Sequence, residues 1–257
     1  MKSAKANKYI RQISVLFFWL LVWYLLARLV DLPLLLPEPE ATFHKLFELW
    51  GKGSFWVNLG GSFLRVTLGF LLAVIFGSGL AVLCARFQLA DALLRPVRSL
   101  IRSTPISSFI ILVLLWLTVT ATPLFISFLA VMPLIWQDVQ QGIEETPAEL
   151  LEMAQSYQFS RLKRALHIYL PSLLPYFYAA CANGIGIAWK ACVAAEVIAR
   201  PMYSVGKNLQ DAKVYLLTDE LFAWTLTVII LSMALEILVR KLIRRRGFKA
   251  GTAGERS

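Results

Sequence analysis

Few residues in this sequence have the types and spacing that catalysis or nucleotide binding requires. Two Gly-Lys pairs, at 51–52 and 206–207, could suggest a phosphate-binding loop. Neither is followed by Ser or Thr, and both lack the first glycine of a Walker A motif. The sequence has only two histidines, His44 and His167, and the membrane topology predicted below places them on opposite sides of the membrane. A Ser-His or Cys-His pair or a zinc site is therefore not expected. We therefore predict no catalytic group, no metal and no cofactor.

Two charged residues inside a long apolar run are the remaining candidates for chemistry. Glu196 lies near the outer end of the run, and an acid inside a membrane span is by default a candidate functional residue. Contact of its carboxylate with interfacial water is the alternative. Lys190, earlier in the same run, could attract an anionic substrate, although snorkelling to the interface is the plainer interpretation. Arg65 is interpreted as an interface anchor.

The composition predicts that these residues lie in a helical membrane protein. The chain has 257 residues, of which 58% are apolar and 16% charged, whereas a soluble domain averages roughly 25% charged residues. These values exclude a disordered chain and argue against an ordinary soluble domain. The net charge of +10 is better explained by basic cytoplasmic loops than by nucleic-acid binding. The three cysteines all fall in apolar runs and are interpreted as small buried hydrophobes.

Long stretches with few charges predict six transmembrane helices. The first span begins near Ile13 and is interpreted as an uncleaved helix, because bulky residues follow it where a signal peptide would have a cleavage site. Residues 63–85, 173–198 and 221–239 form further spans. The charge-free stretch 103–137 is too long for one crossing of a ~30 Å hydrocarbon core, so it must be a hairpin, a broken helix or a strongly tilted one. Its threonines and a proline between 118 and 123 mark the expected turn.

The distribution of Lys and Arg predicts the orientation. With both termini in the cytoplasm, most of the 26 basic residues fall in cytoplasmic segments, as the positive-inside rule requires. We predict a cytoplasmic segment at 1–12, a first helix at 13–30, an external segment at 31–57, a domain of five further helices at 58–242 and a cytoplasmic tail at 243–257. A helix near 41–50 in the external segment either lies at the membrane interface or packs against neighbouring spans.

The longest cytoplasmic loop, about 137–171, is the most informative segment. A short helix is predicted around residues 149–154, because Glu149 suits the positive end of the helix dipole and Pro147 suits the first turn. A second amphipathic helix is predicted over 161–170, before Pro171 and Pro175 open the fifth span. Two short helices make a surface that another protein could bind; an ordinary solvated loop is the alternative.

This loop resembles the cytoplasmic loop of permease subunits in binding-protein-dependent ABC importers. Their pattern is E-A-A, three residues, glycine, nine residues and I-x-L-P. Here Glu152-Met153-Ala154 precede Gln158 at the glycine position, and residues 168–171 read Ile-Tyr-Leu-Pro. Met153 and Gln158 depart from the pattern, and the second puts the exact bend in doubt, because glycine makes a turn that costs Gln158 conformational energy.

More of the chain resembles the nitrate/sulfonate/taurine branch of these permeases. Residues 62–65 resemble its S-L-x-R entry to the second span. Trp189 after Ala188, followed by Glu196 after Ala195, resembles its A-W and A-E pattern. The tryptophan-phenylalanine-glycine that often follows the third span is here Trp-Leu-Thr at 116–118, a further departure.

The resemblance implies an all-α fold, the type I ABC importer transmembrane fold, in the inner membrane. It also implies a second permease copy, two ATPase subunits that hydrolyse ATP, and an external solute-binding protein. The residues expected to couple the chain to the ATPase are Glu149, Glu152, Met153, Ala154, Gln158, Ile168, Leu170 and Pro171. Trp189, Lys190 and Glu196 are candidates for the translocation path or gate.

Two other functions are weighed against the importer. A secondary transporter would need coupling acids at mid-membrane and usually an internal repeat, and neither is found in the sequence. A non-catalytic membrane subunit is compatible with the composition but gives no reason for the loop motif. Dependence of transport on ATP would separate the importer from both.

Overall fold

The computed structural model describes residues 2–245, with side chains described at 11, 14, 15 and 17–241. Every regular element within this part of the chain is helical. The elements are α1 (Lys2–Val30), α2 (Pro39–Trp50), α3 (Gly53–Arg86), α4 (Gln88–Ser103), α5 (Ile106–Val113), α6 (Thr122–Glu144), α7 (Ala148–Ser156), α8 (Arg161–Arg164), the π-helical turn η1 (Ala165–Tyr169), α9 (Leu170–Ala199), α10 (Val205–Val214) and α11 (Thr218–Arg245). The all-α fold class is confirmed.

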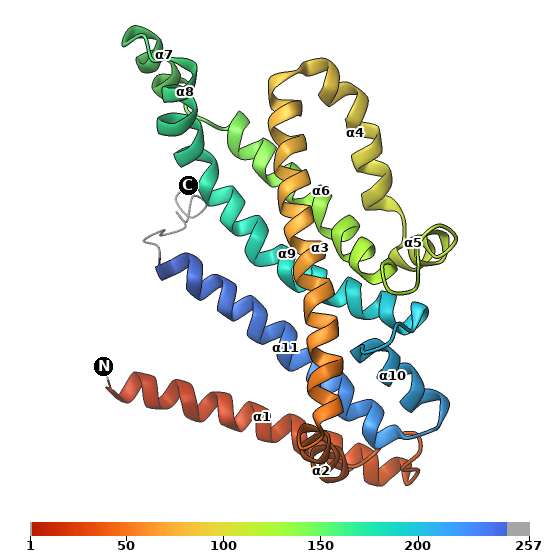
Figure 1. Ribbon diagram of the computed structural model, residues 1–257. Helices are drawn as coiled ribbons and strands as arrows, with labels where there is room; N and C mark the ends of the chain where they lie inside the picture. Colours follow the sequence, from red (N-terminus) through yellow and green to blue (C-terminus); the bar gives the residue numbers. More distant parts are fainter. Residues whose placement is uncertain (1, 246–257) are drawn as a thin grey trace.

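The core of the molecule is formed where the long helices α3, α6 and α9 cross (Figure 1). α3 approaches α6 through Gly69, Ala73, Gly77 and Ala81, which recur every four residues and are all buried. A Cβ atom at Gly77 would lie 2.8 Å from the backbone oxygen of Met132. Only a residue without a side chain lets the two backbones approach this closely, and such contacts drive helix association in a membrane.

Four helical segments are long and apolar enough to cross a membrane: 53–86, 122–144, 161–199 and 218–241. A shorter apolar stretch, Phe17–Val30, forms the C-terminal half of α1. α3 begins at Gly53, which lies before the predicted domain boundary at residue 58. The count of six transmembrane helices stays a prediction.

The charge-free stretch 103–137 contains a turn, as expected. α5 ends at Val113, the chain turns between residues 114 and 121, and α6 starts at Thr122 with Pro123 in its first turn. The segment between the predicted spans 63–85 and 103–137, for which no helix was predicted, forms the amphipathic helix α4 (Gln88–Ser103). α5 has eight residues, about 12 Å at 1.5 Å per residue, so it is too short to cross the membrane alone.

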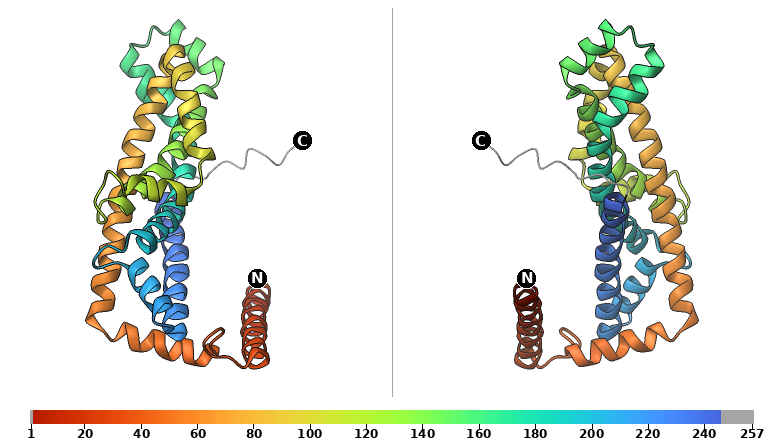
Figure 2. Two further views of the ribbon diagram at one scale, coloured as in Figure 1. Left: turned by 90° about the vertical axis from the view of Figure 1, so that its right-hand side faces the viewer. Right: turned by 90° about the vertical axis from the view of Figure 1, so that its left-hand side faces the viewer.

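The N-terminal helices attach at the opposite end of the molecule from α7 (Figure 1). α2 is the helix expected near 41–50, and it buries Leu46 and Leu49 in a cluster with Phe55 and Trp224. Its packing role is thus present, while Phe47 on another face is 64% exposed and remains available to an interface. The N-terminal part of α1 stands apart from the bundle in both views of Figure 2, whereas Trp23, nearer the other end of the helix, stacks on Phe222 of α11. The last helix extends to Arg245, and the rest of the predicted tail, 246–257, lies outside the described residues.

Candidate functional site

The loop between α6 and α8 projects from one end of the bundle and carries α7 at its tip (Figure 1). At the base of the loop the Tyr176 hydroxyl of α9 donates a hydrogen bond to the Glu145 carboxylate. This bond, supported by one from Gln141, lowers the pKa of Glu145 below its ordinary value. The loop is therefore fixed to α9 at its root, while α7 extends beyond the spans.

Helix α7 presents an apolar row beside an acidic one. Leu150, Met153 and Tyr157 are exposed and spaced at i, i+3 and i+7, which places them on one face. Glu149 and Glu152 are exposed next to them. The carboxylate of Glu152 has no hydrogen-bond or ion-pair partner among the residues whose side chains are described. An exposed apolar row with unpaired acids beside it suits a protein partner that offers an apolar groove and basic residues.

The remaining residues of the loop motif lie in its interior or at its exit. Ala154 is wholly buried and Ile168 is 3% exposed, so neither offers its side chain to a partner. Leu170 is exposed at the start of α9. The structure thus places the predicted coupling residues in three settings. Glu149, Glu152 and Met153 are exposed on α7, and Ala154 and Ile168 are buried. Gln158, Leu170 and Pro171 are exposed at the turn and at the start of α9. Their part in coupling stays a prediction.

Gln158 occupies the position where the family pattern has glycine, and it makes the expected turn. Its φ is 50°, in the left-handed region. The N–H of Phe159 donates to the carbonyl of Ala154 at 2.8 Å, and the N–H of Gln158 donates to the carbonyl of Gln155 at 3.0 Å. These two bonds form a Schellman motif that ends α7, with Gln158 at the position that normally holds glycine. Ser160 then caps α8 by accepting a hydrogen bond from the backbone of Lys163.

We expect Gln158→Gly to stabilise this turn by about 1 kcal/mol, because a left-handed residue with a Cβ costs roughly 1–2 kcal/mol. Hydrogen–deuterium exchange of the amides at 157–159 should then slow about fivefold. Ser156→Gly is the matched control: Ser156 is the last residue of α7, so glycine there should speed exchange. Equal effects of the two glycines would contradict the strain assigned to Gln158.

The predicted second helix of the loop is not separate from the fifth span. α8, η1 and α9 run without interruption from Arg161 to Ala199, so Pro171 lies within a helix and does not open one. The backbone N–H of Leu170 bonds to the carbonyl of Ala165, a π-helical step. Pro171 has no N–H, and its ring would clash with the His167 carbonyl in a regular helix; a wider turn before it relieves that clash. The loop is thereby continuous with α9.

At the other end of α9, Glu196 is completely buried and binds groups from two other elements. Its carboxylate accepts hydrogen bonds from the Ser62 hydroxyl at 2.7 Å, from Arg65 at 2.9 Å and from the Gly206 N–H at 3.1 Å. Arg65 also donates to the carbonyls of Met202 and Tyr203. The Ser62 hydroxyl in turn accepts from the N–H of Val205 at 2.9 Å. This buried cluster ties α3, α9 and α10 together.

The backbone around the cluster is shaped for this contact. A Cβ atom at Gly206 would lie 2.4 Å from the Cβ of Glu196, so α10 can approach α9 only with glycine at this position. Arg200 and Tyr203, in the segment between α9 and α10, both have φ of 53°. Neither residue is a glycine, so a left-handed backbone is unfavourable at both positions. The contacts of this segment therefore impose its conformation.

The sequence interpretation missed the pairing of Arg65 with Glu196. It placed Arg65 as an interface anchor, but its side chain is 11% exposed and lies against the carboxylate. The pairing could have been inferred from the sequence, because the two residues have opposite charges and lie near the outer ends of two predicted spans. A charge buried there needs an opposite charge as its partner.

The other path candidates lie in different surroundings. Trp189 is completely buried and donates its indole N–H to the carbonyl of Val228 on α11 at 3.1 Å. Lys190, the next residue, is exposed on α9. Gly186, one turn earlier, lets Glu236 of α11 approach α9. Trp189 therefore joins the packing between α9 and α11, and the roles of all three candidates in transport stay predictions.

Four of the described helical segments are long and apolar enough to cross a membrane, and a helical loop projects from one end of the bundle. Residues 73–247, well over half of the chain, match the family model described as binding-protein-dependent transport system inner membrane component. The chain belongs to this family, the permeases of ABC transporters.

Relatives with assigned transport systems support this membership. The chain is 28% identical over 240 residues to the taurine transport system permease protein of Escherichia coli, covering 91% of this chain and 87% of that protein. It is 27% identical over 205 residues to the bicarbonate transport system permease protein of Synechocystis sp., covering 76% and 73%. A crystal structure of an amino acid ABC transporter shares the fold, with a TM-score of 0.58 at 15% identity, covering 74% of this chain and 94% of that one.

Proposed function

We propose that this chain forms one half of the transmembrane path of an ATP-driven importer for a small anionic solute. Two copies would line the path, two ATPase subunits would bind on the cytoplasmic side, and an external binding protein would deliver the solute. The observation that carries this proposal is α7, a short helix with an exposed apolar row and unpaired acids, placed beyond the end of the spans.

The continuity of the loop with α9 supplies a physical route for coupling. Movement of an ATPase bound to α7 would pass through the hydrogen-bonded turn at 157–160 and then along one uninterrupted helix from Arg161 to Ala199. At its other end, α9 holds Glu196, which binds the elements at the opposite end of the molecule. ATP-driven closure of the ATPases would shift the permease between inward- and outward-open states by moving this long helix.

The substrate class is proposed from the relatives. One of the relatives described above is named for taurine, which is a sulfonate, and the other for bicarbonate. Both solutes carry an oxyanion group, so we propose a small oxyanion as the solute. Lys190, exposed on α9, is the described path candidate that could meet such an anion. Selectivity would reside largely in the binding protein.

The test is purification of the tagged chain from its native membrane in mild detergent, followed by mass spectrometry of the proteins that stay bound. We expect an ATPase in near-stoichiometric amount, and its activity should rise when a co-purifying binding protein is loaded with solute. A chain that purifies without an ATPase, even after cross-linking from Gln155 at the exposed surface of α7, would contradict the proposal and favour a secondary transporter or a non-catalytic membrane subunit.

A further inference from the structure

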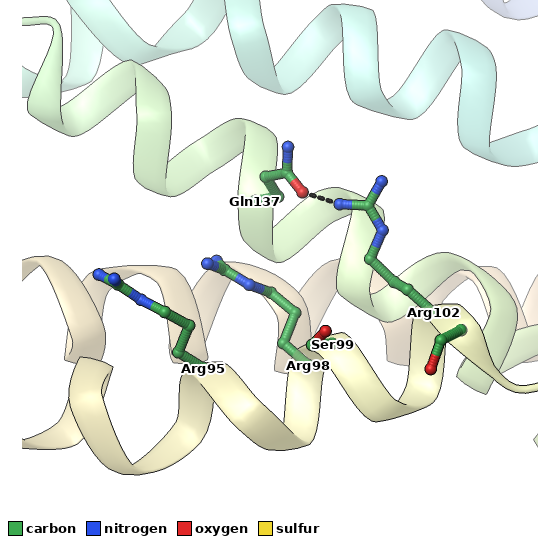
Figure 3. A pocket seen from close by; sticks show the side chains of 6 residues that line it. Arg95, Arg98, Ser99, Arg102 and Gln137 are labelled. Carbon is green, nitrogen blue, oxygen red and sulfur yellow. Dashed lines mark hydrogen bonds between the residues drawn. The ribbon is translucent and has the colours of Figure 1, made fainter.

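Three arginines of α4 line a cavity between this helix and α6. Arg95, Arg98 and Arg102 are spaced at i, i+3 and i+7, so they share one face of the helix, and Figure 3 shows them directed toward the helix that carries Gln137. The cavity has a volume of about 360 Å³, and Ser99, Ser103 and Gln137 complete its lining. This volume falls in the range of small-molecule sites.

The three guanidinium groups differ in how their charge is balanced. Arg95 forms an ion pair with Asp91 on its own helix. Arg98 instead donates to the neutral amide oxygen of Gln140 at 2.9 Å, and Arg102 donates to the amide oxygen of Gln137. Neither has a carboxylate in ion-pair contact among the described residues. Asp91 and Asp138 act on Arg98 and Arg102 only at longer range, beyond ion-pair contact. Both guanidinium groups are thus held by neutral amides and remain available to an anion.

The surroundings of Arg98 hold its guanidinium in place. Its Cζ atom lies 5.0 Å from the centre of the Trp136 ring, and the ring belongs to the buried core of α6. The amide of Gln140 that accepts from Arg98 also donates to Asp91 at 3.0 Å and to Glu144 at 2.8 Å. An arginine that served only to anchor the helix in lipid headgroups would extend away from the protein. Arg98 is instead fixed against α6, as binding sites require.

The opposite face of α4 is apolar and exposed. Leu89, Leu93 and Leu100 are each more than 60% exposed. This face can meet lipid or a second copy of the chain, while the arginine face remains directed toward α6. The amphipathic helix therefore separates a charged cavity from the apolar surroundings.

We propose that Arg98 and Arg102, together with Gln137, bind the oxyanion group of the transported solute on its way to the cytoplasm. A planar guanidinium donates parallel hydrogen bonds to two oxygens of a sulfonate or carboxylate, which suits both solute types named for the relatives. The proposal rests on the proposed function and adds a substrate-binding site to it. The phosphate of an anionic lipid headgroup offers the same oxyanion chemistry, and the test separates the two sources.

The test uses a reporter thiol inside the cavity. Ser99→Cys is introduced into the full chain with its three native cysteines replaced by alanine, and the protein is placed in phosphatidylcholine nanodiscs. The anionic reagent 2-sulfonatoethyl methanethiosulfonate should react with this thiol faster than the cationic trimethylammonium reagent does. The ratio of the two rates should be about ten times the ratio measured for a free thiol in solution. Methanesulfonate should slow the anionic reaction. This assay needs no ATPase, so its failure is distinguishable from a failure of the proposed function.

Matched variants assign the effect to the two unpaired arginines. Arg98→Gln with Arg102→Gln should remove both the charge preference and the protection by methanesulfonate, and Arg102→Gln alone should reduce the preference about threefold. Arg95→Gln should change it less than twofold, because Asp91 balances that charge. Since Arg98 packs on Trp136, Arg98→Lys with Arg102→Lys provides a variant that retains the charge, and it should keep the preference but lose most of the protection.

Three outcomes would overturn the proposal. The first is an absence of charge preference in the parent protein. The second is a preference that survives the double glutamine substitution. The third is a thiol that methanesulfonate does not protect but that phosphatidylglycerol nanodiscs do; this result would assign the cavity to a lipid headgroup.

Discussion

Glu152→Lys is expected to abolish solute transport while the chain still inserts and folds in the membrane. Glu152 is exposed on α7, and its carboxylate has no partner among the described side chains, so the charge reversal should cost little in the isolated permease. In the assembled importer, the new lysine would face the basic surface that the acidic row is proposed to meet. Like charges in an interface should weaken ATPase binding at least tenfold, or about 1.4 kcal/mol.

The measurement is ATPase retention and solute uptake in proteoliposomes that contain the permease, the ATPase and the binding protein. Glu40→Lys is the control, because Glu40 is exposed on α2 at the opposite end of the molecule and undergoes the same change of charge. It should leave ATPase binding unchanged. Normal uptake by Glu152→Lys would show that α7 does not form the coupling contact.

The features predictable from sequence are those set by local periodicity and composition. The apolar runs predicted α3 and α11, and the threonines near residue 120 marked the turn before α6. The turn at Gln158 was predictable because its position in the loop pattern normally holds glycine, and the Schellman bonds supply the physical reason.

The features that sequence reasoning missed depend on contacts between distant segments. No helix was predicted between residues 85 and 103, where the structure has α4 with its arginines on one helical face beside α6. Pro171 indicated a helix start, whereas a π-helical turn lets the helix continue through it. The Arg65–Glu196 pair joins residues that are 131 positions apart, and no periodic pattern connects them.

Arg65→Gln is expected to destabilise the permease by about 3–5 kcal/mol, the usual cost of removing one partner of a buried ion pair. Glu196 would remain completely buried with only the Ser62 hydroxyl and the Gly206 N–H as donors, and the carbonyls of Met202 and Tyr203 would lose their Arg65 bonds. Thermal unfolding in detergent, followed by loss of the monodisperse chromatographic peak, measures the effect. The double variant Arg65→Gln with Glu196→Gln should recover part of the lost stability, because no charge is then buried without a partner.

Arg200→Gln is the matched control for the charge of the arginine. Arg200 pairs with Asp211 near the same end of α9, but the side chains of that pair are 49% and 29% exposed. Water screens such a pair, so its loss should cost at most about 1 kcal/mol. Both variants remove an arginine from a pair with a carboxylate. The difference between their losses of stability therefore measures the effect of burial on the ion pair. Equal destabilisation by both, or a double variant less stable than Arg65→Gln alone, would mean that the Glu196 cluster contributes by packing and not by balancing a buried charge.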